Sequence, residues 1–318
     1  MSVGEGVSLT KSCEECGQPV DAVRCPACQH RQGGGLFAIA YRGLPKNLIS
    51  YVVTIASSRL YWGLLLFAIA PMLLLGLHIN VVVGMMIYFS LFWFFVFQPL
   101  VAAHIQLRPL FTDIGAYLFT GIVGTTFAII VEGFWFRHGG AVLMRSPVLA
   151  VTIPAYVSFV GVTEEFAKQM VVLIVLFWQR SRGRVWPPLT YMMVGVSSGL
   201  GFSAVENISY VQRGISFEVL RHAFGYGTTT ALTRALYTPF LHAIWAGAAA
   251  YCLGVVARRG FRDWWIGLGG IGMAAVFHGI YDASVGIDPS LAIADVAVSY
   301  LVFLALLLND RRLQSGRS

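Results

Sequence analysis

The chain has 318 residues, of which 57% are hydrophobic and only 12% are charged, and its mean hydropathy is +0.71. The apolar share is well above that of an average soluble domain, so the composition excludes an ordinary water-soluble fold. The net charge of +7 does not indicate nucleic-acid binding, because the basic residues form short clusters between apolar runs.

The first thirty residues are polar, lack the apolar stretch of a secretory signal, and contain two Cys-x-x-Cys pairs. Two such pairs can close a tetrahedral zinc site of four thiolates. Two disulfides are the alternative, but pairs of this kind without a signal peptide fit a reducing compartment better. Because so small a unit has no core of its own, zinc would supply its folding free energy. We predict a zinc-ribbon-like knuckle over residues 1–32, with structural zinc bound by Cys13, Cys16, Cys25 and Cys28.

The rest of the chain predicts an all-α, polytopic membrane protein with about eight transmembrane helices. Residues 33–59 resemble a linker and membrane-surface segment, 60–310 a transmembrane domain, and 311–318 a cytoplasmic tail. Eight apolar segments are close to or above the roughly 20 residues that a crossing helix needs. They lie at residues 60–79, 81–101, 114–131, 148–178, 188–211, 234–257, 264–283 and 290–308.

Two features of these segments refine the topology. The segment at 148–178 is too long for one straight crossing, and Pro154 and Gly161 favour a break, a re-entrant path or a strong tilt there. Most Lys and Arg residues fall on one side of the eight crossings. Because Lys and Arg in short loops favour the cytoplasmic side, we expect both termini in the cytoplasm.

Ionisable side chains inside a bilayer are costly, so each one within a span is a candidate functional residue. The candidates are Glu164, Glu165, Lys168, Glu206 with the adjacent Asn207, Arg234, His242, His278 and Asp282. At 1.5 Å per residue, Glu165, Glu206 and His278 lie roughly 20 to 27 Å from the inner ends of their spans. His242 lies roughly 12 Å from the outer end of its span. We therefore expect these residues to converge in the outer half of the membrane.

Carboxylates and imidazoles at one depth can support hydrolysis in two ways. The carboxylate of either Glu164 or Glu165 could take a proton from water while a histidine stabilises the oxyanion. Alternatively, Glu206, His242 and His278 could bind a catalytic zinc ion, with Glu164 or Glu165 as the base. Glu164 and Lys168 could instead form only a structural ion pair.

Four segments resemble the consecutive motifs of the PrsW family of membrane proteases, which is related to the CAAX prenyl endopeptidase and bacteriocin-processing superfamily. They are EEFAK at 164–168, GFSAVENISY at 201–210, RALYTPFLHAIW at 234–245 and HGIYD at 278–282. The resemblance implies a catalytic set of Glu164, Glu165, Glu206, His242 and His278. Lys168, Asn207, Arg234 and Asp282 would support that set, although Asp282 stands where the wider superfamily often has Asn.

The resemblance also implies an intramembrane endopeptidase of metallo- or glutamic type. Its substrate would be a single-span protein similar to an anti-sigma factor, cleaved near the outer face of a bacterial plasma membrane. A proton-coupled transporter is one alternative, and a sensor or scaffold whose zinc head binds a partner is another. We expect no nucleic-acid partner, and the oligomeric state stays open. The remaining ionisable residues at span ends, Glu132 among them, are expected to be solvated.

Overall fold

The computed structural model describes residues 11–12, 19–20, 69–70, 80–102 and 110–315. The chain divides into two units, residues 1–68 and 69–318. In the first unit, strand β1 (Lys11–Ser12) pairs antiparallel with β2 (Pro19–Val20). The four cysteines of the predicted zinc knuckle and nearly all of the predicted segment at 60–79 lie outside the described residues.

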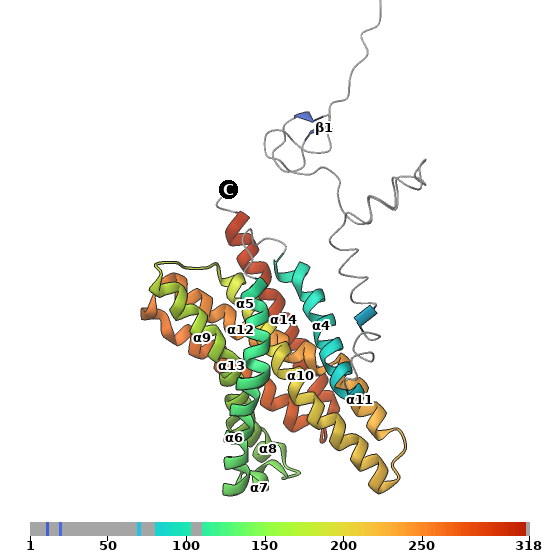
Figure 1. Ribbon diagram of the computed structural model, residues 1–318. Helices are drawn as coiled ribbons and strands as arrows, with labels where there is room; N and C mark the ends of the chain where they lie inside the picture. Colours follow the sequence, from blue (N-terminus) through green and yellow to red (C-terminus); the bar gives the residue numbers. More distant parts are fainter. Residues whose placement is uncertain (1–10, 13–18, 21–68, 71–79, 103–109, 316–318) are drawn as a thin grey trace, which may run out of the picture. The chain divides into compact units, whose positions relative to one another are not determined.

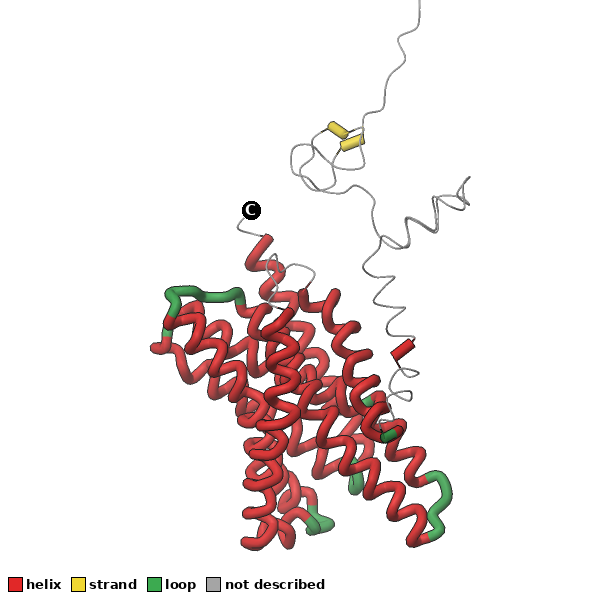
Figure 2. The backbone as a smooth tube through the Cα atoms, in the orientation of Figure 1, coloured by secondary structure: helices red, strands yellow, loops and turns green. Residues whose placement is uncertain are grey.

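The described part of the second unit is helical (Figure 1). Its backbone leaves the helices only at short turns between them (Figure 2). In chain order the helices are α4 (Val81–Ala102), α5 (Leu110–Phe119), α6 (Thr125–Trp135), α7 (Ala141–Met144), α8 (Leu149–Tyr156), α9 (Val162–Ser181), α10 (Pro188–Arg221), α11 (Tyr226–Leu236), α12 (Thr238–Arg259), α13 (Trp264–Ser284) and α14 (Pro289–Ser315). A 3-10 turn, η4 (Phe261–Asp263), precedes α13.

Short π-helical segments connect several of these helices. η1 (Thr120–Gly124) links α5 to α6. Between α6 and α7, η2 (Phe136–Gly140) contains a kink, because the backbone of His138 and Gly139 is not helical. η3 (Val157–Gly161) links α8 to α9 and follows Pro154, whose ring cannot continue the hydrogen bonding of a regular helix. The irregularity predicted from Pro154 and Gly161 is therefore a π turn between two helices.

Five helical segments in the described part of the chain are long and apolar enough to cross a membrane. They span residues 81–98, 110–144, 226–259, 261–284 and 289–309. In the segment at 110–144, α6 continues past residue 131, where the sequence suggested an end, to Trp135. The protein is thus an integral, multi-pass membrane protein. The predicted number of eight crossings is not confirmed, because the segments predicted at 148–178 and 188–211 are not among these five and nearly all of 60–79 lies outside the described residues.

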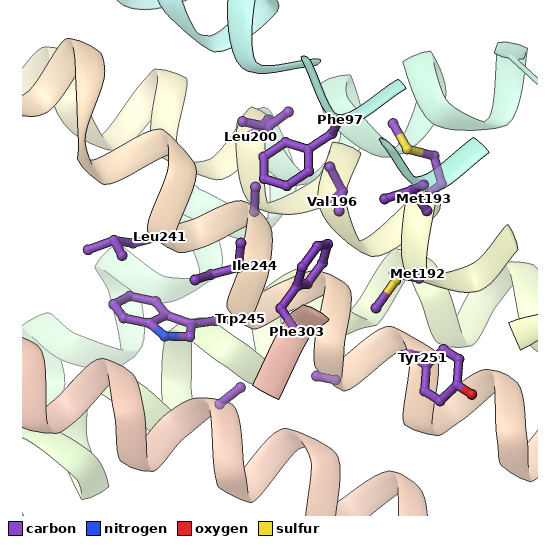
Figure 3. Close-up of a cluster of buried hydrophobic side chains, with 14 of the residues drawn as sticks. Phe97, Met192, Met193, Val196, Leu200, Leu241, Ile244, Trp245, Tyr251 and Phe303 are labelled. Atoms are coloured by element: carbon purple, nitrogen blue, oxygen red, sulfur yellow. The ribbon is translucent and has the colours of Figure 1, made fainter. Parts of the chain in front are cut away.

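The core lies where α10 packs against α4 and α12. Figure 3 shows Phe97 of α4, Val196 of α10, Ile244 of α12 and Phe303 of α14 in one cluster of buried side chains. From Pro188 to Ala204 every residue of α10 is buried, so other helices rather than lipid surround this half of it. This burial explains how α10 can carry a polar sequence at membrane depth.

Glycines bring the helices that carry the polar residues close together. A Cβ atom added to Gly199 of α10 would overlap the carbonyl group of His242 in α12. One added to Gly161 would overlap the carbonyl oxygen of Ala275 in α13, and one added to Gly279 the backbone of Val157. Small residues of this kind allow backbones to approach in membrane helix packing. They allow α10 to lie close to α12, and η3, which directly precedes α9, to lie close to α13.

Candidate functional site

The first turn of α9 carries a buried ion-pair network. Lys168 is completely enclosed, and its Nζ lies 3.2 Å from Oε2 of Glu164 and 2.7 Å from Oε1 of Glu165. The ammonium also lies 4.5 Å from the centre of the Phe202 ring. Breaking a buried pair of this kind leaves an uncompensated charge, so the three side chains depend on one another.

His278 of α13 joins this network from the facing helix. Its Nδ1–H donates to Oε1 of Glu165 at 2.9 Å, because an ionised carboxylate can only accept. Its Nε2 lies 3.6 Å from Oε2 of Glu164 and 3.4 Å from Oδ2 of Asp282. The indole of Trp245 stacks on the imidazole at 4.8 Å between ring centres. The His278 ring is thus contacted by the Trp245 indole on one face and by carboxylates at both nitrogens.

A second group forms between α10 and α12. Oε2 of Glu206 lies 3.2 Å from Nε2 of His242 and 3.9 Å from Nη1 of Arg234. The Asn207 side chain donates to the carbonyl oxygen of Arg234 at 2.8 Å and accepts from Thr238 at 3.1 Å. Asn207 therefore fixes the junction of α11 and α12, from which Arg234 reaches Glu206.

The two groups meet at the histidines. The rings of His242 and His278 are nearly perpendicular, with centres 5.3 Å apart. Potential ligand atoms of Glu164, His242 and His278 lie within 4.8 Å of one another, and all three residues are buried. Nδ1 of His242 is enclosed and has no hydrogen-bond partner within the described part of the chain. Two imidazole nitrogens and a carboxylate oxygen form a donor set that suits a divalent metal ion.

A cavity of 610 Å³ adjoins this group. Its wall is formed by α6, the α8–η3–α9 segment, α10 and the end of α13. Carboxylates on this wall come from Glu132, Glu164, Glu206 and Asp282. Glu165 and the two histidines do not line the cavity. Its volume lies within the roughly 300 to 1,000 Å³ typical of ligand sites.

The structure brings together all of the membrane residues that the sequence singled out. Their convergence agrees with the common depth expected for them, whereas their roles stay predictions. The potential ligand atoms that lie within 4.8 Å of one another belong to Glu164, His242 and His278. The predicted catalytic zinc set had Glu206 in place of Glu164. Glu206 instead contacts His242 from the cavity side.

Glu132 is the residue that the sequence reading missed. It was expected to be solvated at the end of a span, but it lies within α6 and forms part of the cavity wall. A signal was present, because Thr125, Ala128, Ile129, Glu132 and Phe136 recur at helical spacing and all line the cavity. Extending that helix beyond residue 131 would have placed Glu132 on its inner face.

Residues 109–308 match the family described as PrsW family intramembrane metalloprotease. No curated protein and no solved structure matches the chain. The matched region contains every membrane residue of the candidate site and more than half of the sequence. The chain therefore belongs to the PrsW family of intramembrane metalloproteases, and it is a peptidase that acts on membrane proteins within the bilayer.

Proposed function

We propose that Glu164, His242 and His278 bind a catalytic zinc ion and that Glu206 acts as the general base for peptide-bond hydrolysis. The observation that carries the proposal is the meeting of these three ligands beside a cavity that Glu206 lines. The free Nδ1 of His242 supports the ligand assignment, since a buried ring nitrogen otherwise needs a partner.

The charges support a divalent ion. In the contacts described above, four carboxylates meet two permanent cations, Lys168 and Arg234. The four are Glu164, Glu165, Glu206 and Asp282. Neutral imidazoles leave two negative charges uncompensated, and a divalent cation would balance them. When bound, such an ion would polarise the substrate carbonyl and make water more acidic.

The cavity distinguishes the carboxylates by what they can reach. Glu165 is enclosed, and its Oε1 accepts from Lys168 and His278, so it orients His278. Glu206 lines the cavity and can meet water there. In our proposal Glu206 takes a proton from the attacking water, whose oxygen bonds to the carbonyl carbon. The same proton passes to the amide nitrogen as the C–N bond breaks.

The substrate is proposed to be a single-span membrane protein of the anti-sigma-factor type, cleaved near the outer face of a bacterial plasma membrane. The outer-half depth estimated for Glu165, Glu206 and His278 supports this side of the membrane. The cavity is lined by α6 and α8 and by α10, and these helices diverge in Figure 1. This position suits a peptide that arrives from the bilayer.

A library of single-span reporter polypeptides with a randomised outer juxtamembrane segment tests the proposal. Purified chain should cleave members of the library, lose this activity with a chelator, and regain it with zinc. His242→Ala and His278→Ala should each lose the catalytic zinc ion and cleavage. His222→Asn is the matched control, because His222 is exposed at a left-handed turn that Asn tolerates. Full cleavage by metal-free wild type would refute the zinc mechanism.

A further inference from the structure

The Glu132 carboxylate differs from the others that line the cavity. Glu164 pairs with Lys168, Glu206 with Arg234, and Asp282 contacts His278. In contrast, Glu132 forms no ion pair with a Lys, Arg or His among the described residues, and its Oε1 has no hydrogen-bond partner there. The metal site proposed above does not use this residue.

A carboxylate at membrane depth is costly unless something pairs with it. Glu132 lines the cavity and is only partly buried, so a cation that enters the cavity can pair with its carboxylate. Arg213 also lines the cavity and is the internal rival for this role. Its guanidinium instead lies over the Tyr210 ring at 5.6 Å, and no ion pair joins it to Glu132 in the described structure.

The neighbours of Glu132 indicate which group would fit. Ala128, Ile129 and Phe136 lie on the same helical wall of the cavity. Val160 and Phe202 add apolar surface from η3 and α10. Apolar side chains beside a carboxylate that forms no ion pair suit a long aliphatic side chain that ends in a cation, because its stem packs on them while its head pairs with the carboxylate. Lys and Arg have this form.

We propose that Glu132 is a specificity-determining residue, which binds a Lys or Arg side chain of the substrate close to the scissile bond. This inference rests on the proposed function, since it assigns the cavity to the substrate peptide. Glu132 does not touch the metal ligands or the attacking water in this scheme, so it selects substrates without performing the chemistry.

Cleavage-site selection tests the inference directly. With the reporter library, wild type should enrich Lys and Arg at one fixed position relative to the cleaved bond. Glu132→Gln should lose that enrichment by about tenfold, the range expected for a hydrogen bond to a charged group. Glu132→Lys should shift the preference to Asp and Glu. Cleavage of members that are neutral at that position, and the zinc content, should be unchanged.

Two variants serve as controls. Asp263→Asn removes a carboxylate from the turn between α12 and α13, away from the cavity lining, and should keep the wild-type preference. Arg213→Gln tests the internal rival. If Glu132 serves only to pair with Arg213, both variants should reduce cleavage of all library members alike. That result, or a wild type without preference for basic residues, would overturn the inference.

A binding measurement separates this inference from the proposed mechanism. Two fluorescent peptides that differ only in Lys or Met at the selected position are titrated into the chain carrying Glu206→Gln, in which cleavage is blocked. Adding Glu132→Gln should weaken binding of the Lys peptide about tenfold and leave the Met peptide unchanged. If this holds while Glu206→Gln still cleaves, the assignment of the base fails and the specificity site stands. Equal losses for both peptides refute the specificity site.

Discussion

Lys168 lies between two carboxylates at a depth where no water reaches it, and its three neighbours come from two helices. We predict that Lys168→Met lowers the free energy of unfolding by about 3 to 5 kcal/mol, because two buried carboxylates lose their counter-charge. Reversible unfolding in mixed micelles measures the change. The double variant with Glu165→Gln should recover part of the loss, and a single variant within about 1 kcal/mol of wild type would contradict the role given to Lys168.

Glu206 and Glu165 should respond differently to the same change. Glu206→Gln removes the proposed base, so we expect cleavage to fall about 10² to 10⁴-fold with zinc still bound. Glu165→Gln removes a partner of His278, so we expect zinc affinity to fall about 10 to 100-fold. Zinc titration and single-turnover cleavage measure both. The opposite pattern would support the alternative in which Glu206 is a ligand and Glu165 the base.

The sequence singled out the membrane residues that converge in the structure, because ionisable side chains are rare within apolar segments and are therefore easy to recognise there. It did not predict how they pair. Whether Glu164 or Glu206 lies with both histidines depends on how far α10 is rotated against α12, and the pattern of either helix alone does not determine this. Glu132 was missed because the predicted span ended at residue 131, whereas α6 continues to Trp135 and the backbone leaves the helical conformation only at His138 and Gly139.

At the scale of helices, the approach of α10 to α12 depends on Gly199. Gly199→Ala places a methyl group on the carbonyl of His242, so we predict a loss of about 1 to 3 kcal/mol in unfolding free energy. Zinc affinity should fall as well, because His242 must move with its backbone. Gly269→Ala on α13 is the control, since nothing lies within 4 Å of an added Cβ there.

The two glycine variants should therefore separate packing from intrinsic helix preference. Alanine is favoured over glycine in helices by about 1 kcal/mol, so Gly269→Ala should be neutral or stabilising. Equal effects of the two variants on stability and on zinc affinity would contradict a specific contact at Gly199.

Sequence patterns indicated these helices through their apolar runs, but they could not indicate the π turns, whose geometry depends on contacts such as that of Gly279 with Val157.

At the scale of the whole molecule, composition predicted a helical membrane protein, and the five apolar helices and the family match confirm that class. The number of crossings was harder to predict. The predicted spans at 148–178 and 188–211 are not among the five apolar segments, and the buried half of α10 shows that a helix enclosed by its neighbours can carry polar residues. The domain limits at residues 32, 59 and 310 and the cytoplasmic position of both termini stay predictions.

The zinc content of the full-length chain connects the predicted head to the membrane site. We predict two zinc ions per wild-type chain, one bound by Cys13, Cys16, Cys25 and Cys28 and one by Glu164, His242 and His278. Replacing the four cysteines by serine should leave one ion and preserve cleavage if the head only recruits or regulates. The His242→Ala, His278→Ala double variant should also retain one ion but lose cleavage.

Elemental analysis and reporter cleavage are both measured on the wild type, the cysteine variant and the histidine double variant, and the two measurements must agree. A single ion that disappears only with the cysteines would leave the membrane site without metal and favour water activation by the glutamates alone. Loss of both ions in the cysteine variant would mean that the membrane site depends on the head for its folding. Since the two sites use different donors, thiolates in one and imidazoles with a carboxylate in the other, cobalt substitution distinguishes them by their absorption spectra.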